Sequence, residues 1–135
     1  MSFNRFTSKG ILKYSTLEPQ ISYKLSLSVD VGVAEFYRSL VPKAYRCQPG
    51  RYEPHVTIVR NELPPNMEKW GIYEGREVEF EYDTEVWYDG TYWWLECYSE
   101  FLEDIRVDLG LPIYSEWNCP PSMRSCFHMT IGNSK

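Results

Sequence analysis

The sequence Pro54-His55-Val56-Thr57-Ile58-Val59-Arg60 is matched near the other end of the chain by Phe127-His128-Met129-Thr130-Ile131-Gly132-Asn133. The chain has two histidines, and each is followed two residues later by a threonine. Because residues i and i+2 of a strand project from the same face, each copy predicts an imidazole beside a hydroxyl, with apolar residues on the opposite face. Two such strands lying side by side would bring two imidazoles and two hydroxyls into one cleft.

A single histidine on a strand is most often structural or solvated. At average composition, a serine or threonine follows a given residue by two positions roughly one time in ten, so chance would supply both copies in about one chain in a hundred. Both copies also lie in short apolar runs that are typical of strands. We therefore interpret the pair as a site rather than a coincidence.

Composition indicates a single domain that binds a small ligand. The 135 residues are enough for one hydrophobic core, and eleven Tyr, six Phe and five Trp suit a cleft whose rings stack on flat ligands. The net charge of −5 lacks the basic surplus of proteins that follow a nucleic-acid backbone. A small nucleotide is therefore favoured over a long nucleic acid. No apolar run has the length of a membrane span, so we expect a cytosolic protein with no membrane partner.

The four cysteines are Cys47, Cys97, Cys119 and Cys126, and no two of them form a Cys-x-x-Cys pair. We expect reduced, idle thiols. Cys119, Cys126 and His128 could in principle share a metal ion, but their spacing fits no usual zinc pattern, and a metal would occupy His128. We expect neither a metal nor a cofactor.

The remaining pattern predicts two similar halves. The first contains an alternating strand over 23–30 and a helix over 33–40, and the second contains a strand over 78–82, a hairpin turn at Asp89-Gly90 and a helix over 101–109. Each half then ends in its own His-x-Thr strand. This arrangement predicts an α+β domain whose two lobes face each other across a sheet-lined groove. Phe36 and Phe101 are expected in the core.

Two histidines that face one substrate are suited to act as general base and general acid, because their ordinary pKa near 6.5 allows one to be neutral while the other is protonated. Thr57 and Thr130 are poor candidates for nucleophiles, since each lies beside its own histidine. Their hydroxyls fit better as donors to phosphate oxygens. The pattern favours metal-independent phosphodiester cleavage, in which a ribose 2′-hydroxyl attacks the adjacent phosphorus.

The paired His-x-Thr strands resemble the signature of the 2H phosphoesterase superfamily. Four further stretches resemble the anti-CBASS proteins of T4-like phages, so that the likeness covers most of the chain. These are Gly10-Ile11-Leu12-Lys13-Tyr14, Phe36-Tyr37-Arg38-Ser39-Leu40, Arg106-Val107-Asp108-Leu109-Gly110-Leu111-Pro112 and Cys126-Phe127-His128-Met129-Thr130-Ile131-Gly132-Asn133.

The resemblance implies the two-lobed LigT-like α+β fold, in which antiparallel sheets form a central cleft and helices pack outside. It also implies a phage enzyme, a monomer in the host cytoplasm, that opens cyclic di- and trinucleotide alarm signals at a 3′–5′ linkage without metal.

When the motifs of this chain are matched to those of the superfamily, the resemblance implies that His55 and His128 form the acid–base pair. It likewise implies that Thr57 and Thr130 bind the scissile phosphate. It does not decide which histidine is the base. Family members stack aromatic residues on nucleobases, and the candidates here are Tyr14 and Trp87, for which a packing role is nearly as plausible.

Two alternatives remain open. Many 2H proteins process RNA ends, acting on 2′,3′-cyclic phosphates or 2′–5′ linkages, although the acidic charge and the many aromatic residues favour a small cyclic ligand. A protein that sequesters a nucleotide without cleaving it is the other alternative. It has no need of two correctly placed imidazoles, and both motifs are intact.

Overall fold

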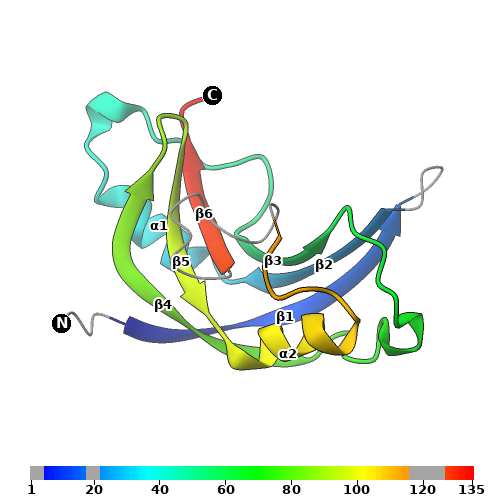
Figure 1. The fold of residues 1–135 in the computed structure, drawn as a ribbon. Coiled ribbons are helices and arrows are strands. Elements are labelled where there is room, and N and C mark those ends of the chain that lie inside the picture. Colours follow the sequence, from blue (N-terminus) through cyan, green and yellow to red (C-terminus); the bar gives the residue numbers. More distant parts are fainter. Residues whose placement is uncertain (1–4, 18–21, 116–126) are drawn as a thin grey trace.

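The computed structural model describes residues 5–17, 22–115 and 127–135, and in these residues six antiparallel strands close into a barrel (Figure 1). Around the barrel the strands follow the order β1-β2-β3-β6-β5-β4. Their bounds are β1 (Arg5–Leu17), β2 (Ser22–Val29), β3 (His55–Arg60), β4 (Glu77–Tyr88), β5 (Tyr92–Tyr98) and β6 (Phe127–Asn133).

The expected two-lobed α+β, LigT-like fold is wrong, because the strands of the two halves belong to one closed barrel. The long strand β1 joins them. Its first part pairs with β4, from Arg5↔Asp83 to Ile11↔Glu77, and its second part pairs with β2, from Gly10↔Val29 to Leu17↔Ser22. At the overlap a side chain on Gly10 would collide with the carbonyl of Ser28, so this close approach requires glycine.

The individual strands and turns match the predictions made from the sequence, although the overall architecture does not. In β2, Leu25, Leu27 and Val29 are buried and alternate with half-exposed residues, as the pattern predicts. Asp89-Gly90 forms the turn between β4 and β5, and Gly90 takes the left-handed φ of 103° that this turn requires. Local shifts of register in three strand pairs accompany the strong curvature seen in Figure 1.

Two α-helices are present in the described residues, α1 (Val31–Ser39) and α2 (Glu100–Asp108), and both were predicted. Their first turns are capped by Asp30 and Ser99, whose side chains accept hydrogen bonds from the amides of Gly32 and Leu102. Neither helix is long and apolar enough to cross a membrane. Short 3₁₀ turns occur at Lys43–Tyr45 (η1) and Met67–Lys69 (η2).

The expectation that Phe36 lies in the core is wrong. Its side chain is 57% exposed, whereas Ala34 and Tyr37 form the buried face of α1. Burial raises the pKa of the Tyr37 hydroxyl to about 12. Phe101 is half-buried and packs against the core from α2. The helical period predicted both helices correctly, but it did not fix the rotation of α1 against the sheet.

Helix α2 is attached to β3 by a buried arginine. The Arg106 guanidinium makes two hydrogen bonds of 2.8 Å to the Glu62 carboxylate and also donates to the carbonyls of Ile58 and Pro112. Ile58 lies in β3 immediately after Thr57. This cluster therefore fixes the strand that carries the first His-x-Thr motif.

Candidate active site

Strands β3 and β6 are antiparallel neighbours and pair at Val56↔Met129. Both of these residues are completely buried. In an antiparallel ladder this register places His55 opposite Thr130 and Thr57 opposite His128, on the face away from Val56 and Met129. All four side chains line one cavity. The structure thus brings the two motifs into a single site.

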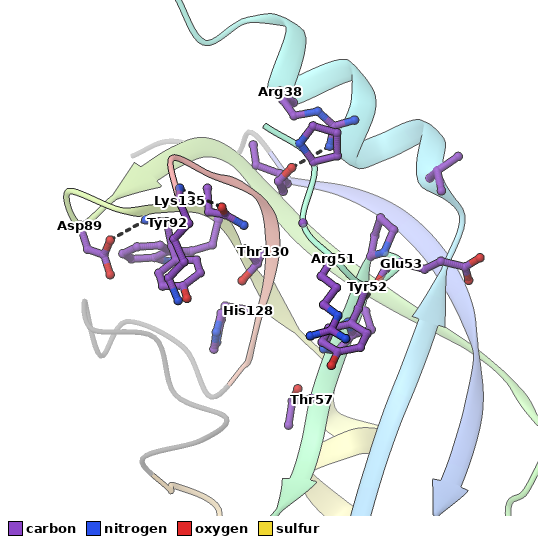
Figure 2. A pocket seen from close by; sticks show the side chains of 18 of the residues that line it. Arg38, Arg51, Tyr52, Glu53, Thr57, Asp89, Tyr92, His128, Thr130 and Lys135 are labelled. Carbon is purple, nitrogen blue, oxygen red and sulfur yellow. Dashed lines mark hydrogen bonds between the residues drawn. The ribbon is translucent and has the colours of Figure 1, made fainter. Parts of the chain in front are cut away.

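The cavity has a volume of about 1410 Å³ and receives residues from α1, the segment 49–54, β3, the β4–β5 turn, β5 and β6. Figure 2 shows His128 and Thr130 on β6, with Thr57 on the neighbouring strand β3. Small-ligand pockets usually measure roughly 300–1,000 Å³. This cavity has room for a ligand larger than a mononucleotide.

A backbone carbonyl determines the orientation of the His55 ring. Its Nδ1 lies 2.9 Å from the carbonyl oxygen of Glu53. A carbonyl only accepts hydrogen bonds, so Nδ1 carries the proton and donates it to Glu53. In the neutral ring, Nε2 then keeps a lone pair, which is the form that a general base requires.

His128 lies in a different environment on β6. Its Cα partner on β5 is Glu96, which is completely buried, and its ring packs edge-on near Trp94 with the ring centroids 6.5 Å apart. Glu96 also accepts a hydrogen bond of 3.3 Å from the Tyr98 hydroxyl, whose pKa is raised by burial and by this carboxylate. The two histidines therefore have different neighbours: a backbone carbonyl holds the His55 ring, and the Trp94 ring lies beside His128.

The described lining is more cationic than the chain as a whole. Four basic side chains and three acidic ones line the cavity, in a chain of net charge −5; these are Arg38, Arg51, Arg60 and Lys135 against Glu35, Glu53 and Asp89. The Asp89 carboxylate makes its hydrogen bonds within the β4–β5 turn. It accepts from the amides of Thr91 and Tyr92 at 2.9 and 2.7 Å, and these bonds lower its pKa. An anionic ligand suits this lining better than a cationic one.

Arg38 connects helix α1 to the site. Its guanidinium donates a hydrogen bond of 2.8 Å to the carbonyl of Ile131, next to Thr130 (Figure 2). This bond spans 93 residues of sequence and holds α1 against the strand that carries the second motif. Arg38 therefore combines a structural role with a place in the cavity lining.

The two predicted base-stacking residues lie elsewhere. Tyr14 lines a separate depression of about 550 Å³ beside β1 and β2, and its ring packs edge-on against Trp70 at 4.9 Å. Trp87 pairs with Trp94 across β4 and β5 and is not among the described residues that line the large cavity. Cys119 and Cys126, considered above as metal ligands, lie outside the described residues.

The aromatic residues that do line the cavity are Tyr52, Tyr92, Trp94 and Tyr114, none of which was identified from the sequence. Tyr92 and Trp94 lie on β5, the strand next to the second motif, so their position depends on the order of the strands. Trp94 is almost completely buried, and its indole nitrogen has no hydrogen-bond partner in the part of the chain that the structure describes. Within the same residues, no three His, Cys, Asp or Glu side chains are grouped to hold a metal ion.

No model of a known protein family matches this chain, and no curated protein or solved structure matches it either. The chemistry of the site is therefore inferred from its own residues and from the motif resemblance.

Proposed function

We propose that this protein is a metal-independent phosphodiesterase that opens cyclic di- and trinucleotides at a 3′–5′ linkage by acid–base catalysis. The observation that carries the proposal is the pairing of β3 with β6, which puts His55, Thr57, His128 and Thr130 into one cavity. Paired imidazoles supply both proton transfers of such a reaction, and paired hydroxyls supply donors for the phosphate oxygens.

His55 is assigned as the base and His128 as the acid. Nε2 of neutral His55 takes the proton of the ribose 2′-hydroxyl, whose oxygen forms a bond to phosphorus. The bond from phosphorus to the 5′-oxygen breaks, and protonated His128 gives its proton to that oxygen. The products of this step are a 2′,3′-cyclic phosphate end and a 5′-hydroxyl end, with the ring opened at one linkage.

Thr57 and Thr130 donate hydrogen bonds to the non-bridging phosphate oxygens. In the register of the two strands, each threonine lies opposite the histidine of the other strand. A phosphate held by both hydroxyls therefore lies between the two rings. This alternation supports roles for both threonines as phosphate ligands.

The substrate class is supported by the size of the cavity, by its basic lining and by the acidic charge of the chain as a whole. The roles are those of the 2H phosphoesterase superfamily, which the motifs resemble, although the barrel differs from the arrangement expected with that resemblance. The likeness to anti-CBASS proteins further supports a phage enzyme that removes cyclic-oligonucleotide alarm signals in the host cytoplasm, acting as a monomer.

The proposal is tested by incubating the purified protein with 3′,3′-cyclic GMP–AMP and cyclic tri-adenylate in excess EDTA, with products analysed by chromatography and mass spectrometry. We expect linear products from the intact protein and none from the His55→Ala/His128→Ala variant. A Ser134→Ala variant, altered on the same chain segment but outside the cavity lining, serves as the matched control.

Two results would contradict the proposal. Intact cyclic substrates together with cleavage of an RNA 2′,3′-cyclic phosphate would indicate processing of RNA ends. Tight binding of cyclic nucleotide without turnover, unchanged in the double-histidine variant, would indicate a sequestering protein.

A further inference from the structure

The depression of about 550 Å³ beside β1 and β2 lies on the same face of the sheet as the catalytic residues. In β2, Leu25 and Leu27 are completely buried, so Lys24 and Ser26 project from the opposite face and line this depression. Ser26 is the Cα partner of Thr57 on β3. Because directly opposed residues of neighbouring strands share a face, the β1–β2 depression continues the face that carries Thr57.

The register of β1 extends this face by one more strand. Lys13 is the Cα partner of Ser26, and Ser15 is that of Lys24. Lys13 therefore lies on a row that runs through Ser26 to Thr57, across the neighbouring strands β1, β2 and β3 (Figure 1). Neighbouring strands are about 4.8 Å apart, so the backbone of Lys13 lies about 10 Å from that of Thr57.

Lys24 lies at the border between the depression and the large cavity. On β3, Ile58 and Val59 are both completely buried, and the pairing with β2 shifts register at this point. This bulge returns Arg60 to the cavity face, where it is the Cα partner of Lys24. The Lys24 ammonium also lies 5.9 Å from the centre of the Tyr52 ring, which lines the cavity. A ligand in the cavity can therefore extend across β2 into the depression.

The charged groups of the depression favour an anion. Its described lining contains two cations, Lys13 and Lys24, and one carboxylate, Glu74. Glu74 accepts a hydrogen bond of 3.2 Å from the amide of Tyr14. In the part of the chain that the structure describes, neither lysine forms an ion pair with a carboxylate. Two ammonium groups beside two serine hydroxyls provide hydrogen-bond donors for the several oxygens of a phosphate group.

We propose that the β1–β2 depression binds the phosphate of the ligand that is not cleaved. Lys13 and Lys24 donate hydrogen bonds to its oxygens, while the scissile phosphate lies between His55 and His128. This inference rests on the proposed phosphodiesterase function and names the part of the substrate that is recognised away from the reacting atoms. It favours ligands with at least two phosphates, such as cyclic di- and trinucleotides, over a single 2′,3′-cyclic phosphate.

The test is calorimetry with two ligands, the 2′-deoxy form of 3′,3′-cyclic di-AMP and the linear deoxydinucleotide dApdA. Both carry two adenines, but only the cyclic ligand has a second phosphate. Both lack the 2′-hydroxyl that the proposed reaction requires, so the intact protein can bind them without cleaving them. The variants are Lys13→Met and Lys24→Met. Lys9→Met, on β1 but outside both described linings, is the matched control.

We expect each lysine variant to bind the cyclic ligand about 10-fold more weakly than Lys9→Met does, and to bind dApdA as the control does. The affinity of both variants for the cyclic ligand should also fall less steeply with added salt, because one charged contact is lost. Lys13→Arg keeps the charge and should retain the affinity. The inference is overturned if either methionine variant binds the cyclic ligand like the control, or if both ligands lose affinity equally.

Incubation of the intact protein with the ribonucleotide 3′,3′-cyclic di-AMP separates this inference from the proposed function. If cyclic di-AMP is not cleaved but both lysine changes selectively weaken binding of its deoxy form, the phosphate subsite holds and the catalytic proposal fails. If cyclic di-AMP is cleaved and both lysine variants bind the deoxy form like Lys9→Met, the catalytic proposal holds and the phosphate subsite fails.

Discussion

Replacing Arg106 by methionine should lower the free energy of unfolding by about 3–5 kcal/mol. Arg106 is completely buried on α2, and its guanidinium donates hydrogen bonds to Glu62, Ile58 and Pro112, all of which lie outside the helix. Methionine has a similar length and no charge, so it fills much of the same space. The destabilisation therefore comes from the buried acceptors that lose their hydrogen-bond donor when the guanidinium is removed.

The largest contribution to the loss of stability comes from the Glu62 carboxylate. Its side chain is only 15% exposed, and two hydrogen bonds of 2.8 Å from the guanidinium compensate its charge. Removing one partner of a buried ion pair leaves an uncompensated charge, which accounts for the range given above. Adding Glu62→Gln removes that charge, so the double variant should recover part of the loss. The unpaired carbonyl of Ile58 should still cost about 1–3 kcal/mol.

The measurement is urea unfolding followed by tryptophan fluorescence, with Lys9→Met as control. Lys9 makes an ion pair with Glu77 at 3.6 Å, but both side chains are more than half exposed, so its loss should change stability by less than about 1 kcal/mol. Arg106→Met should also lower Tm by about 10–20 °C. A loss within about 1 kcal/mol of the control, or no recovery in the double variant, would refute the assignment of this pair as the anchor of β3.

Three other changes test local features. Gly132→Ala should lower the free energy of unfolding by about 1–3 kcal/mol, because the added Cβ would lie 2.5 Å from the Cys47 sulfur and 2.7 Å from the Gln48 carbonyl. The same clash should displace residues 49–54, which line the cavity, and so reduce the proposed cleavage activity by more than the loss of stability explains. Unfolding and activity assays on one preparation check both effects. Asp89 has a lowered pKa in the folded protein, so its ionised form stabilises the turn above its unfolded pKa of about 3.9, and this contribution is lost as the pH falls through the lower folded value. Below about pH 4, the free energy of unfolding of Asp89→Asn should therefore depend less steeply on pH than that of the wild type. Equal slopes for the two proteins in that range would count against the hydrogen bonds of this turn. Cys97 is buried and its thiol pKa is raised by burial, so a thiol reagent should label it only on unfolding, as peptide mapping by mass spectrometry can show; labelling of native Cys97 at the rate of a free thiol would contradict its burial.

Much of the local structure and the central residues of the site follow from the sequence alone. The period of two in 23–30 and around both His-x-Thr motifs determined which side chains share a face, because that property depends only on strand geometry. The helical period and the Asp89-Gly90 turn are similarly local. His55, Thr57, His128 and Thr130 could be proposed together because their residue types and spacing are distinctive. Their common cavity still depended on β3 and β6 being neighbours.

The tertiary structure alone decided the architecture and the rest of the cavity. Alternation identifies the faces of a strand but not its neighbours, since strand pairing joins residues far apart in the sequence. Thus β1 closes the barrel by pairing with both β2 and β4, where the sequence indicated two lobes. The same order of strands places Tyr92 and Trp94 beside the histidines and leaves Tyr14 and Trp87 outside the described cavity lining. Aromatic residues are abundant along this chain, so only the fold determines which of their rings line the cavity.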